Sequence, residues 1–263
     1  MNKVRVIVRK EWSEVFKNRM VLFSVSFLPL VLTALPLFAL YMTRSMEDAS
    51  AAGFSDMPAA FAQLCVGLNG LECAQYFLVS QFLSVFLTMP VVIPVMIASY
   101  SIVGEKRTRT LEPLLATPIT TLELLAGKAL AATIPALAAT WLSYVVFTVG
   151  TSLITASPLL VSKVLAPLWL LAIFGIGPLL SIAGVSVAVM ISSRVNDPRV
   201  AEQLSTLVVL PLLALFVAQA SGVIALGNTL IVWIAIALIV IDGGLLYFAT
   251  RLFQRETILT RWK

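Results

Sequence analysis

Six long apolar stretches constrain this chain of 263 residues more than any other feature. Hydrophobic residues make up 60% of it and charged residues only 12%, against about 45–50% and about 25% in a soluble domain. Because a helix rises about 1.5 Å per residue, roughly 20 apolar residues cross about 30 Å of hydrocarbon. We therefore predict an all-α polytopic membrane protein. Its six predicted transmembrane helices are 20–42, 76–103, 129–154, 164–191, 204–226 and 229–250.

The positive charges predict the orientation of these helices. Only Arg44 and Lys163 fall on one side of the membrane, and all other Lys and Arg residues fall on the opposite side. The positive-inside rule then places both termini in the cytoplasm, with residues 1–263 forming one domain in the cytoplasmic (inner) membrane. The net charge of +5 is explained by contact with anionic membrane lipid. It therefore does not indicate binding to nucleic acid.

The residue types exclude several kinds of active site. The chain has no histidine, which excludes Ser/His/Asp and Cys/His nucleophiles and His-ligated metals. Two cysteines are too few for a Cys-based zinc site. The segment Ala126-Gly127-Lys128-Ala129 lacks the earlier glycine and the following Ser/Thr of a phosphate loop. We therefore expect no catalytic residue, no metal site and no ATP hydrolysis in this chain.

The exterior segment, residues 43–75, contains both cysteines. Cys65 and Cys73 flank the turn signal Asn69-Gly70, so the chain can fold back and join the two sulfurs. A continuous helix would instead hold the two residues about 12 Å apart. A disulfide and two free thiols both remain open.

Residues 1–19 predict an amphipathic helix in the headgroup plane of the membrane. The apolar side chains recur at spacings of three and four and are Val4, Ile7, Val8, Trp12, Val15 and Phe16. The opposite side carries Lys3, Arg9, Lys10, Ser13, Glu14 and Lys17. The alternative is a simple anchor beside the membrane with no further role.

The cytoplasmic segment 104–128 predicts a short helix with an exposed apolar side. Thr110 is a candidate cap, Pro118 ends the segment, and the next helix begins near Thr120 or Thr121. The short helix displays Leu111, Leu114 and Leu115. It is too short to cross a bilayer and too apolar for water, so it needs a partner surface. The alternative is that these leucines rest on the chain's own helices.

Proline and small residues mark contacts inside the bilayer. Prolines interrupt five of the six spans, and neighbouring helices must then satisfy the carbonyl groups that each proline frees. In the fourth span, small residues lie on one face and permit close helix packing: Gly177, Ser181, Gly184 and Ala188. The packing partner belongs either to the same chain or to a second copy.

Asp242 is the only formal charge well inside a span. An ionised carboxylate there costs several kcal/mol unless it is paired or hydrated. Asp242 therefore either pairs with a basic residue near the cytoplasmic surface or handles a substrate or proton.

Two groups of motifs resemble those of permease subunits in type-2 (ABC-2-type) exporters of the ABC transporter class. The first group is Arg9-Lys10-Glu11-Trp12 and Phe16-Lys17-Asn18-Arg19. The second is Gly104-Glu105-Lys106, Thr110-Leu111-Glu112, Leu114-Leu115-Ala116-Thr117-Pro118 and Gly127-Lys128. The resemblance implies a half-transporter that pairs with an identical or homologous permease above two separate ABC ATPase subunits. ATP and Mg²⁺ would bind those ATPases.

The same resemblance assigns roles to individual residues. It implies that the short cytoplasmic helix and the N-terminal interfacial helix both contact the ATPase, which points to Glu105, Thr110, Leu111, Glu112, Leu114, Leu115, Trp12 and Phe16. It also implies re-entrant helices between the fifth and sixth spans, for which residues 221–228 are too few unless the fifth span ends near Pro211. The expected function is ATP-driven export of a hydrophobic or amphipathic substrate. The alternative is an ion-coupled secondary transporter that uses Asp242.

Overall fold

The computed structural model describes residues 3–44, 65, 68, 70–108, 110, 119–155, 157–224 and 226–252. Within these residues every regular element is a helix, and six helical stretches are long and apolar enough to cross a membrane. These are Val21–Thr43, Gly70–Arg107, Leu122–Thr155, Pro158–Ser192, Pro198–Ala220 and Asn228–Leu252. The predicted fold class, an all-α polytopic membrane protein, is confirmed.

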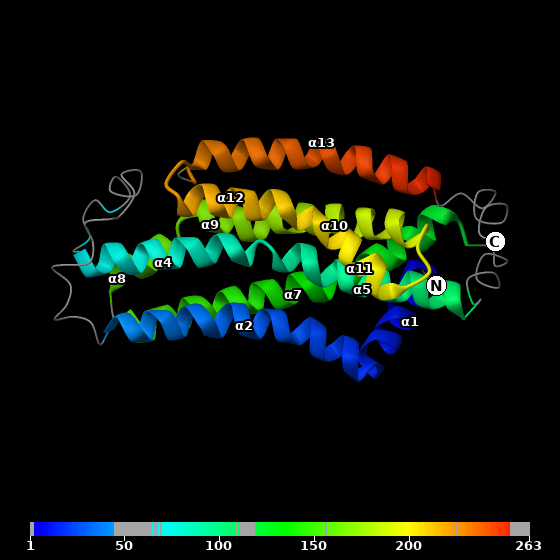
Figure 1. Ribbon diagram of the computed structural model, residues 1–263, viewed down its shortest axis with the longest axis horizontal. Coiled ribbons are helices and arrows are strands. Elements are labelled where there is room, and N and C mark those ends of the chain that lie inside the picture. The colour runs from blue at the N-terminus through cyan, green and yellow to red at the C-terminus, as the bar shows by residue number, and fades with distance from the viewer. Residues whose placement is uncertain are drawn as a thin grey trace.

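The first three spans follow a short helix that lies across one end of the bundle. This helix is α1 (Lys3–Lys17), and the first span is α2 (Arg19–Arg44). The second span is α4 (Gly70–Phe86) followed by α5 (Met89–Arg107), and the third is α7 (Thr121–Thr155). Figure 1 shows the spans side by side, with α1 and the last turns of α13 at the same end. We call this the α1 end.

The last three spans are assembled from shorter pieces. The fourth is α8 (Pro158–Val164), α9 (Pro167–Leu170), the π-helical segment η3 (Leu171–Ile176) and α10 (Gly177–Ser192). The fifth is α11 (Pro198–Thr206), the 3₁₀ turn η4 (Leu207–Val209) and α12 (Leu210–Ala220), and the sixth is α13 (Asn228–Leu252). The fourth span was predicted over 164–191; in the structure it begins earlier, at Pro158, and Pro167 starts a new helix within it.

Local sequence signals explain where several helices begin. Thr120 and Glu123 form a capping box before α7, in which each side chain accepts a hydrogen bond from the other residue's backbone N–H. Ser157 caps α8 and Asp197 caps α11, each followed directly by proline, whose missing N–H has no partner in a first turn. The predicted start of the third helix near Thr120 or Thr121 is confirmed.

Helices α5 and α10 form the centre of the bundle. Their contact uses the predicted small-residue stripe: a Cβ added at Gly184 would lie 3.0 Å from the Val91 carbonyl oxygen of α5. The Ser181 hydroxyl donates a hydrogen bond of 2.7 Å to the Pro90 carbonyl. Pro94 cannot donate to that carbonyl within α5, so Ser181 replaces the lost partner. The stripe therefore packs against the same chain.

The connection between α12 and α13 is a short turn. Helix α12 ends at Ala220 and α13 begins at Asn228. Gly222 has a φ of 73°, a conformation that favours glycine. The described residues of this connection, 221–224 and 226–227, contain no helix. The re-entrant helices that the resemblance implied are therefore not found in them.

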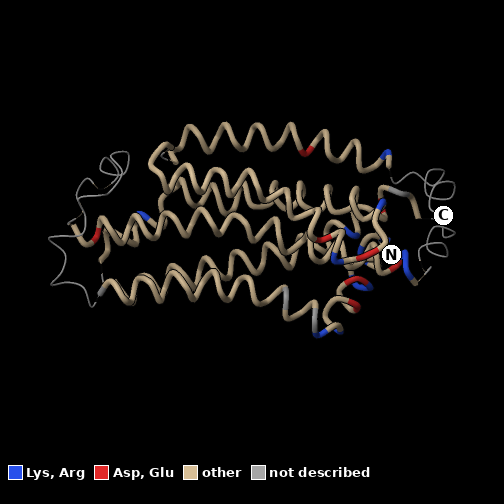
Figure 2. The backbone as a smooth tube through the Cα atoms, in the orientation of Figure 1, with Lys and Arg blue, Asp and Glu red and all other residues tan. Residues whose placement is uncertain are grey.

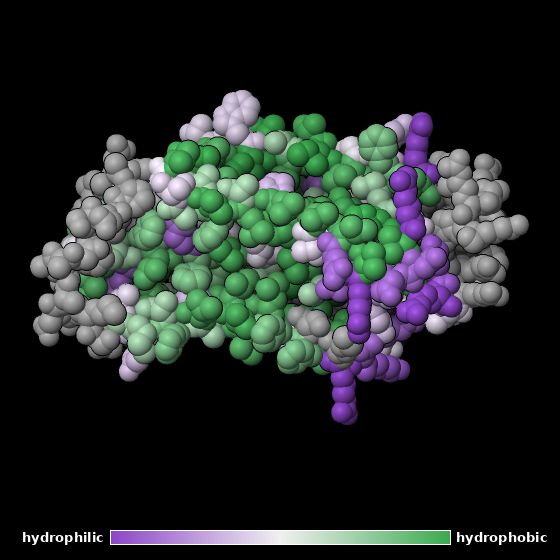
Figure 3. All heavy atoms as spheres, viewed as in Figure 1, coloured by the Kyte–Doolittle hydropathy of each residue, from purple (hydrophilic) through white to green (hydrophobic). Residues whose placement is uncertain are grey.

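The surface separates into an apolar band and a charged end. Large apolar side chains such as Leu153, Val217 and Trp233 are exposed along the spans, and Figure 3 shows the apolar side chains as a broad band. Figure 2 shows Lys, Arg, Asp and Glu gathered mainly at the α1 end. An exposed apolar band with charges at its end is the surface expected of a multi-pass membrane protein.

Candidate functional site

The buried side of α1 carries a carboxylate. Ile7, Glu11 and Val15 are spaced four residues apart and are the buried residues of this helix. Glu11 is only 2% exposed. The sequence analysis placed Trp12 and Phe16 on the same side as Ile7 and Val15, but Phe16 is 50% exposed. The face of α1 that packs on the bundle is therefore centred on Glu11.

Lys128 of α7 is the partner of Glu11. Its Nζ lies 2.8 Å from Oε1 of Glu11 and 2.7 Å from Oε2 of Glu105 near the end of α5. It also donates a 2.7 Å hydrogen bond to the Ser101 hydroxyl, which in turn donates to Oε2 of Glu11. Three helices therefore meet at one buried ammonium group.

Lys10 supplies a second positive charge beside the two buried carboxylates, Glu11 and Glu105. Its ammonium group pairs with Glu105 and lies 3.6 Å from Oε1 of Glu11 and 3.5 Å from Oε1 of the exposed Glu14. Two cations thus face two buried carboxylates. We call Lys10, Glu11, Ser101, Glu105 and Lys128 the ion cluster. Buried charges are tolerated when they are paired and hydrogen-bonded in this way.

Gly127 permits the close approach of α1 to α7 that the ion cluster needs. A Cβ at this position would lie 2.7 Å from Cγ2 and 2.8 Å from Cβ of Ile7. Atoms at these distances would have to move, and Ile7 is itself buried against the bundle. The pair Gly127-Lys128 therefore has a physical explanation: the glycine admits α1, and the lysine binds Glu11.

Electrostatics keep the groups of α1 in their charged forms. Burial alone would raise the pKa of the Glu11 carboxyl, but Lys128 and the hydrogen bond from Ser101 hold that pKa below its ordinary value. Partial burial alone would lower the pKa of the Lys10 ammonium, but its hydrogen bond and charge interaction with Glu105 raise that pKa. Both groups are therefore ionised at neutral pH.

Within the cytoplasmic segment 104–128, the ion cluster lies on both sides of residues 111–118, which carry the leucines predicted to contact the ATPase. Glu105 precedes residues 111–118, and its backbone carbonyl accepts a 3.1 Å hydrogen bond from the Thr110 N–H. Lys128 follows them in α7. A further pair, Lys3 with Glu123 at 3.3 Å, joins the start of α1 to the start of α7. Helix α1 is therefore tied to the chain on either side of residues 111–118.

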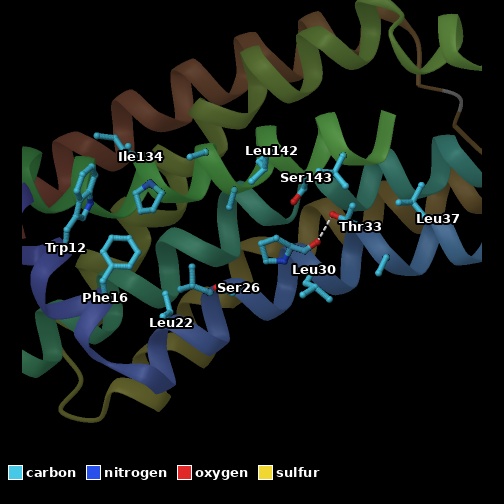
Figure 4. Close-up of a pocket in the computed structure, with 17 residues that line it drawn as sticks. Trp12, Phe16, Leu22, Ser26, Leu30, Thr33, Leu37, Ile134, Leu142 and Ser143 are labelled. Carbon is cyan, nitrogen blue, oxygen red and sulfur yellow. Dashed lines mark hydrogen bonds between the residues drawn. The ribbon is translucent and has the colours of Figure 1, made fainter. Parts of the chain in front are cut away.

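The predicted contact residues fall into three groups. Leu111, Glu112, Leu114 and Leu115 lie outside the described residues. Thr110 is exposed next to the ion cluster. Glu105 is only 5% exposed and pairs with Lys10 and Lys128 inside the cluster. Trp12 and Phe16 lie on a different face of α1 from Glu11, with their rings edge to face at 6.5 Å, and point into a cavity between α2 and α7 (Figure 4).

Glu11 and Lys128 occur in the motifs of the family resemblance, but the sequence predicted no role for them or for Ser101. One signal for Glu11 was present: it lies midway between Ile7 and Val15 at helical spacing. The amphipathic pattern alone favours placing a charged residue on the solvent side. The buried position becomes favourable because Lys128 on α7 opposes Glu11, with Ser101 and Lys10 as further partners.

The opposite end of the bundle contains the two cysteines. Cys65 and Cys73 form a disulfide with their Cα atoms 5.2 Å apart. Of the two alternatives that the sequence left open, the structure has the bonded one. Nearby, the Ser157 hydroxyl donates a 2.6 Å hydrogen bond to Glu72, which links the start of α8 to the start of α4.

Asp242 lies in α13 and is 5% exposed. Neither of its carboxylate oxygens has a hydrogen-bond partner among the described residues, and no ion pair forms there. The pairing with a basic residue near the membrane surface, one of the two sequence alternatives, is thus not seen in the described part of the chain.

Comparison with known proteins identifies the family of the chain. The sequence model of a family described as "ABC-2 family transporter protein" matches residues 5–248, which is nearly the whole chain. A comparison with curated proteins found no match. Permeases of this family are non-catalytic membrane components that work with ABC ATPase partners. The chain therefore belongs to the ABC-2 transporter family, as the membrane-spanning permease component of an ABC transporter.

Proposed function

We propose that this permease exports a hydrophobic or amphipathic substrate, driven by ATP hydrolysis in two separate ATPase subunits. The ATPases would bind ATP and Mg²⁺ and contact the α1 end, and a second identical or homologous permease would complete the pathway. The chain would lie in the cytoplasmic (inner) membrane with both termini in the cytoplasm. The gathering of Lys and Arg at the α1 end supports this orientation.

The ion cluster is the observation that carries the proposal. It joins α1, α5 and α7 through Lys128, directly beside the segment that would contact the ATPase. An ATPase that moves residues 111–118 would therefore move three helices as one unit. Because α5 packs tightly on α10 through Gly184, that movement would reach the centre of the bundle.

The first test removes the apolar contact with the ATPase. The permease is purified with its ATPase, and Leu114→Glu and Leu115→Glu are compared with wild type. A charge at this contact should lower ATPase recovery at least about tenfold, because one uncompensated buried charge costs several kcal/mol. Val200→Glu is the control, since Val200 is 42% exposed on α11, outside the segment. Stoichiometric binding and unchanged ATPase activity in both leucine variants would contradict the proposal.

A second candidate function is supported by the carboxylate of Asp242, which has no hydrogen-bond partner within the described part of the chain. In this case the chain alone would move substrate in exchange for an ion or proton. Purified chain in liposomes, without ATPase or ATP, tests this directly under an imposed proton or sodium gradient. Gradient-driven flux that Asp242→Asn abolishes would favour the second candidate. No flux from the isolated chain favours the ATP-driven exporter.

A further inference from the structure

A deep groove separates α2 from α7 near α1. At its far end the two helices touch: a Cβ added at Gly150 of α7 would lie 2.6 Å from Cδ2 of Leu37 of α2. Towards α1 they diverge and leave a cavity of about 760 Å³. Its lining, drawn in Figure 4, consists of Trp12, Phe16, Leu22, Val25, Ser26, Pro29, Leu30, Thr33, Ala34, Leu37, Ile134, Pro135, Ala138, Ala139, Leu142, Ser143 and Val146. We call it the α2–α7 groove.

The end of the groove beside α1 is held in place by a specific hydrogen bond. Pro135 has no N–H, so it cannot donate to the Ala131 carbonyl four residues before it. The indole N–H of Trp12 donates to this carbonyl instead, at 3.0 Å. The bond fixes Trp12 as a wall of the groove, with Phe16 packed edge to face against it.

The groove is apolar and open along its side. Leu30 of α2 and Leu142 of α7 line it and are each 66% exposed. The Thr33 hydroxyl donates a 2.6 Å hydrogen bond to the Pro29 carbonyl, which satisfies its own donor within α2 (Figure 4). In a membrane this opening faces the hydrocarbon, so the groove accepts an apolar chain from the bilayer.

The length of the groove fits one leaflet. Leu22 and Leu37 mark its two ends on α2, and the fifteen residue steps from one to the other correspond to about 22 Å of helix. Half of the hydrocarbon core is about 15 Å thick. A single acyl chain of the leaflet next to α1 can therefore lie along most of the groove.

Helical spacing places basic residues beside the mouth of the groove, which is its end next to α1. Arg5 and Arg9 precede Trp12 by seven and three residues and so share its face of α1, although the sequence pattern had placed Arg9 on the side opposite Trp12. Arg19 precedes Leu22 by three residues on α2. All three arginines are exposed. Arginine binds phosphate oxygens through paired N–H donors. The basic mouth beside an apolar groove matches a lipid that has a negatively charged phosphate and an acyl tail.

We infer that the α2–α7 groove binds one anionic phospholipid from the leaflet next to α1. The acyl chain lies between α2 and α7 below Trp12, and the phosphate lies at Arg9 and Arg19. Charge favours this occupant over a second copy of the chain, because a symmetric contact through the groove would bring two cationic mouths together. A bound lipid would also hold α1 where Glu11 reaches Lys128.

The test measures lipid retained by the full-length chain. Purified protein in detergent is mixed with equal amounts of dioleoyl-phosphatidylglycerol and dioleoyl-phosphatidylcholine and analysed by native mass spectrometry. Wild type should retain one phosphatidylglycerol in preference to phosphatidylcholine. Each of Arg9→Gln and Arg19→Gln should reduce that preference about fivefold, as expected for loss of one basic residue at a lipid surface. Arg194→Gln, an exposed arginine elsewhere, should leave it unchanged.

Filling the groove gives an independent readout. Ala138→Trp from α7 and Leu30→Trp from α2 should each abolish retention of both lipids, whereas Val240→Trp, at a 71% exposed site on α13, should not. Equal retention of the two lipids by wild type would overturn the inference. Retention by correctly folded Ala138→Trp or Leu30→Trp protein would do the same. A dimer that contains no lipid and is dissociated by either variant would assign the groove to a second copy.

Discussion

The ion cluster and Asp242 are two buried acidic sites with opposite surroundings. Glu11 is 2% exposed and contacts Lys128 at 2.8 Å, with Ser101 as a further donor. Asp242 is 5% exposed and has no hydrogen-bond partner among the described residues. The first carboxylate fixes three helices relative to one another, whereas the second makes no such contact in the part of the chain that the structure describes. Burial of a carboxylate therefore does not by itself indicate a structural role. A structural role also requires a partner of opposite charge on another helix, as Lys128 is for Glu11.

This difference has a physical basis. A buried ion pair adds little net stability because desolvation offsets the attraction, but removing one partner leaves an uncompensated charge. The ion cluster should therefore respond strongly to single substitutions and weakly to replacement of all its charges. Asp242 should respond weakly to neutralisation. Four predictions test this contrast, from the largest expected effect to the smallest.

Lys128→Met should destabilise the permease by about 3–5 kcal/mol, because Glu11 and Glu105 lose their shared cation. Thermal unfolding of the purified chain in detergent measures the change. Lys17→Met, at an exposed position on α1, is the control and should change stability by less than about 0.5 kcal/mol. Replacing Lys128, Glu11 and Glu105 together by Met should recover most of the stability that Lys128→Met alone loses. A loss of stability below about 1 kcal/mol in Lys128→Met would contradict the stabilising role of Lys128 in the ion cluster.

Gly127→Ala should destabilise the chain by about 1–3 kcal/mol, because the added methyl group meets Ile7 and pushes α1 away. Hydrogen exchange should show faster exchange in α1 and little change in α13. Gly104→Ala is the matched control, since a Cβ there meets nothing within 4 Å. If the amide hydrogens of α1 exchange equally fast in Gly127→Ala and Gly104→Ala, the close packing of α1 on α7 is not needed to hold α1 in place.

The contribution of Glu11 should disappear in acid. Its pKa is held below the ordinary value of 4.5, so the carboxylate stabilises the fold above pH 4.5 and loses this effect as pH falls through the lowered pKa. Wild type should therefore be more stable than Glu11→Gln at pH 7, and the gap should narrow below pH 4.5. Melting temperatures of both proteins between pH 3 and pH 7 measure this. A constant gap would exclude ionised Glu11 as its cause.

Asp242→Asn should change stability by no more than about 0.5 kcal/mol, or increase it, because the substitution removes a buried charge without breaking any pair formed by the described residues. The same unfolding assay in detergent applies. Asp197→Asn, at the cap of α11, is a useful comparison because it alters a carboxylate with a known hydrogen bond. A loss above about 1 kcal/mol in Asp242→Asn would show that this carboxylate has a partner in the working protein.

Much of the fold could be predicted from the sequence. The six spans follow from the length of the apolar stretches, and the start of α7 follows from Thr120 and Glu123. The small stripe of the fourth span correctly indicated close packing. The start of that span at Pro158 could not be obtained from hydropathy, because Lys163 interrupts the apolar stretch within α8. Hydropathy also did not show that a separate helix begins at Pro167.

The candidate site was harder to predict because it depends on contacts between distant residues. Trp12 and Phe16 looked like a face that packs on the bundle, yet they line an open groove. Glu11 looked like a surface charge until α7 placed Lys128 against it. Helical periodicity identifies an apolar face of a helix. It cannot show that a charged residue on that face, such as Glu11, pairs with a buried residue of opposite charge on another helix.

One measurement tests most directly whether the ion cluster links α1 rigidly to the segment that we propose contacts the ATPase. Spin labels are placed at Ser13→Cys on α1 and Thr110→Cys, both exposed positions, in the permease–ATPase complex. The account predicts one narrow distance that is the same without nucleotide and with trapped ATP, and a broad distribution in Lys128→Met. A shift in wild type of a helical turn, roughly 5 Å, between the two states would contradict it.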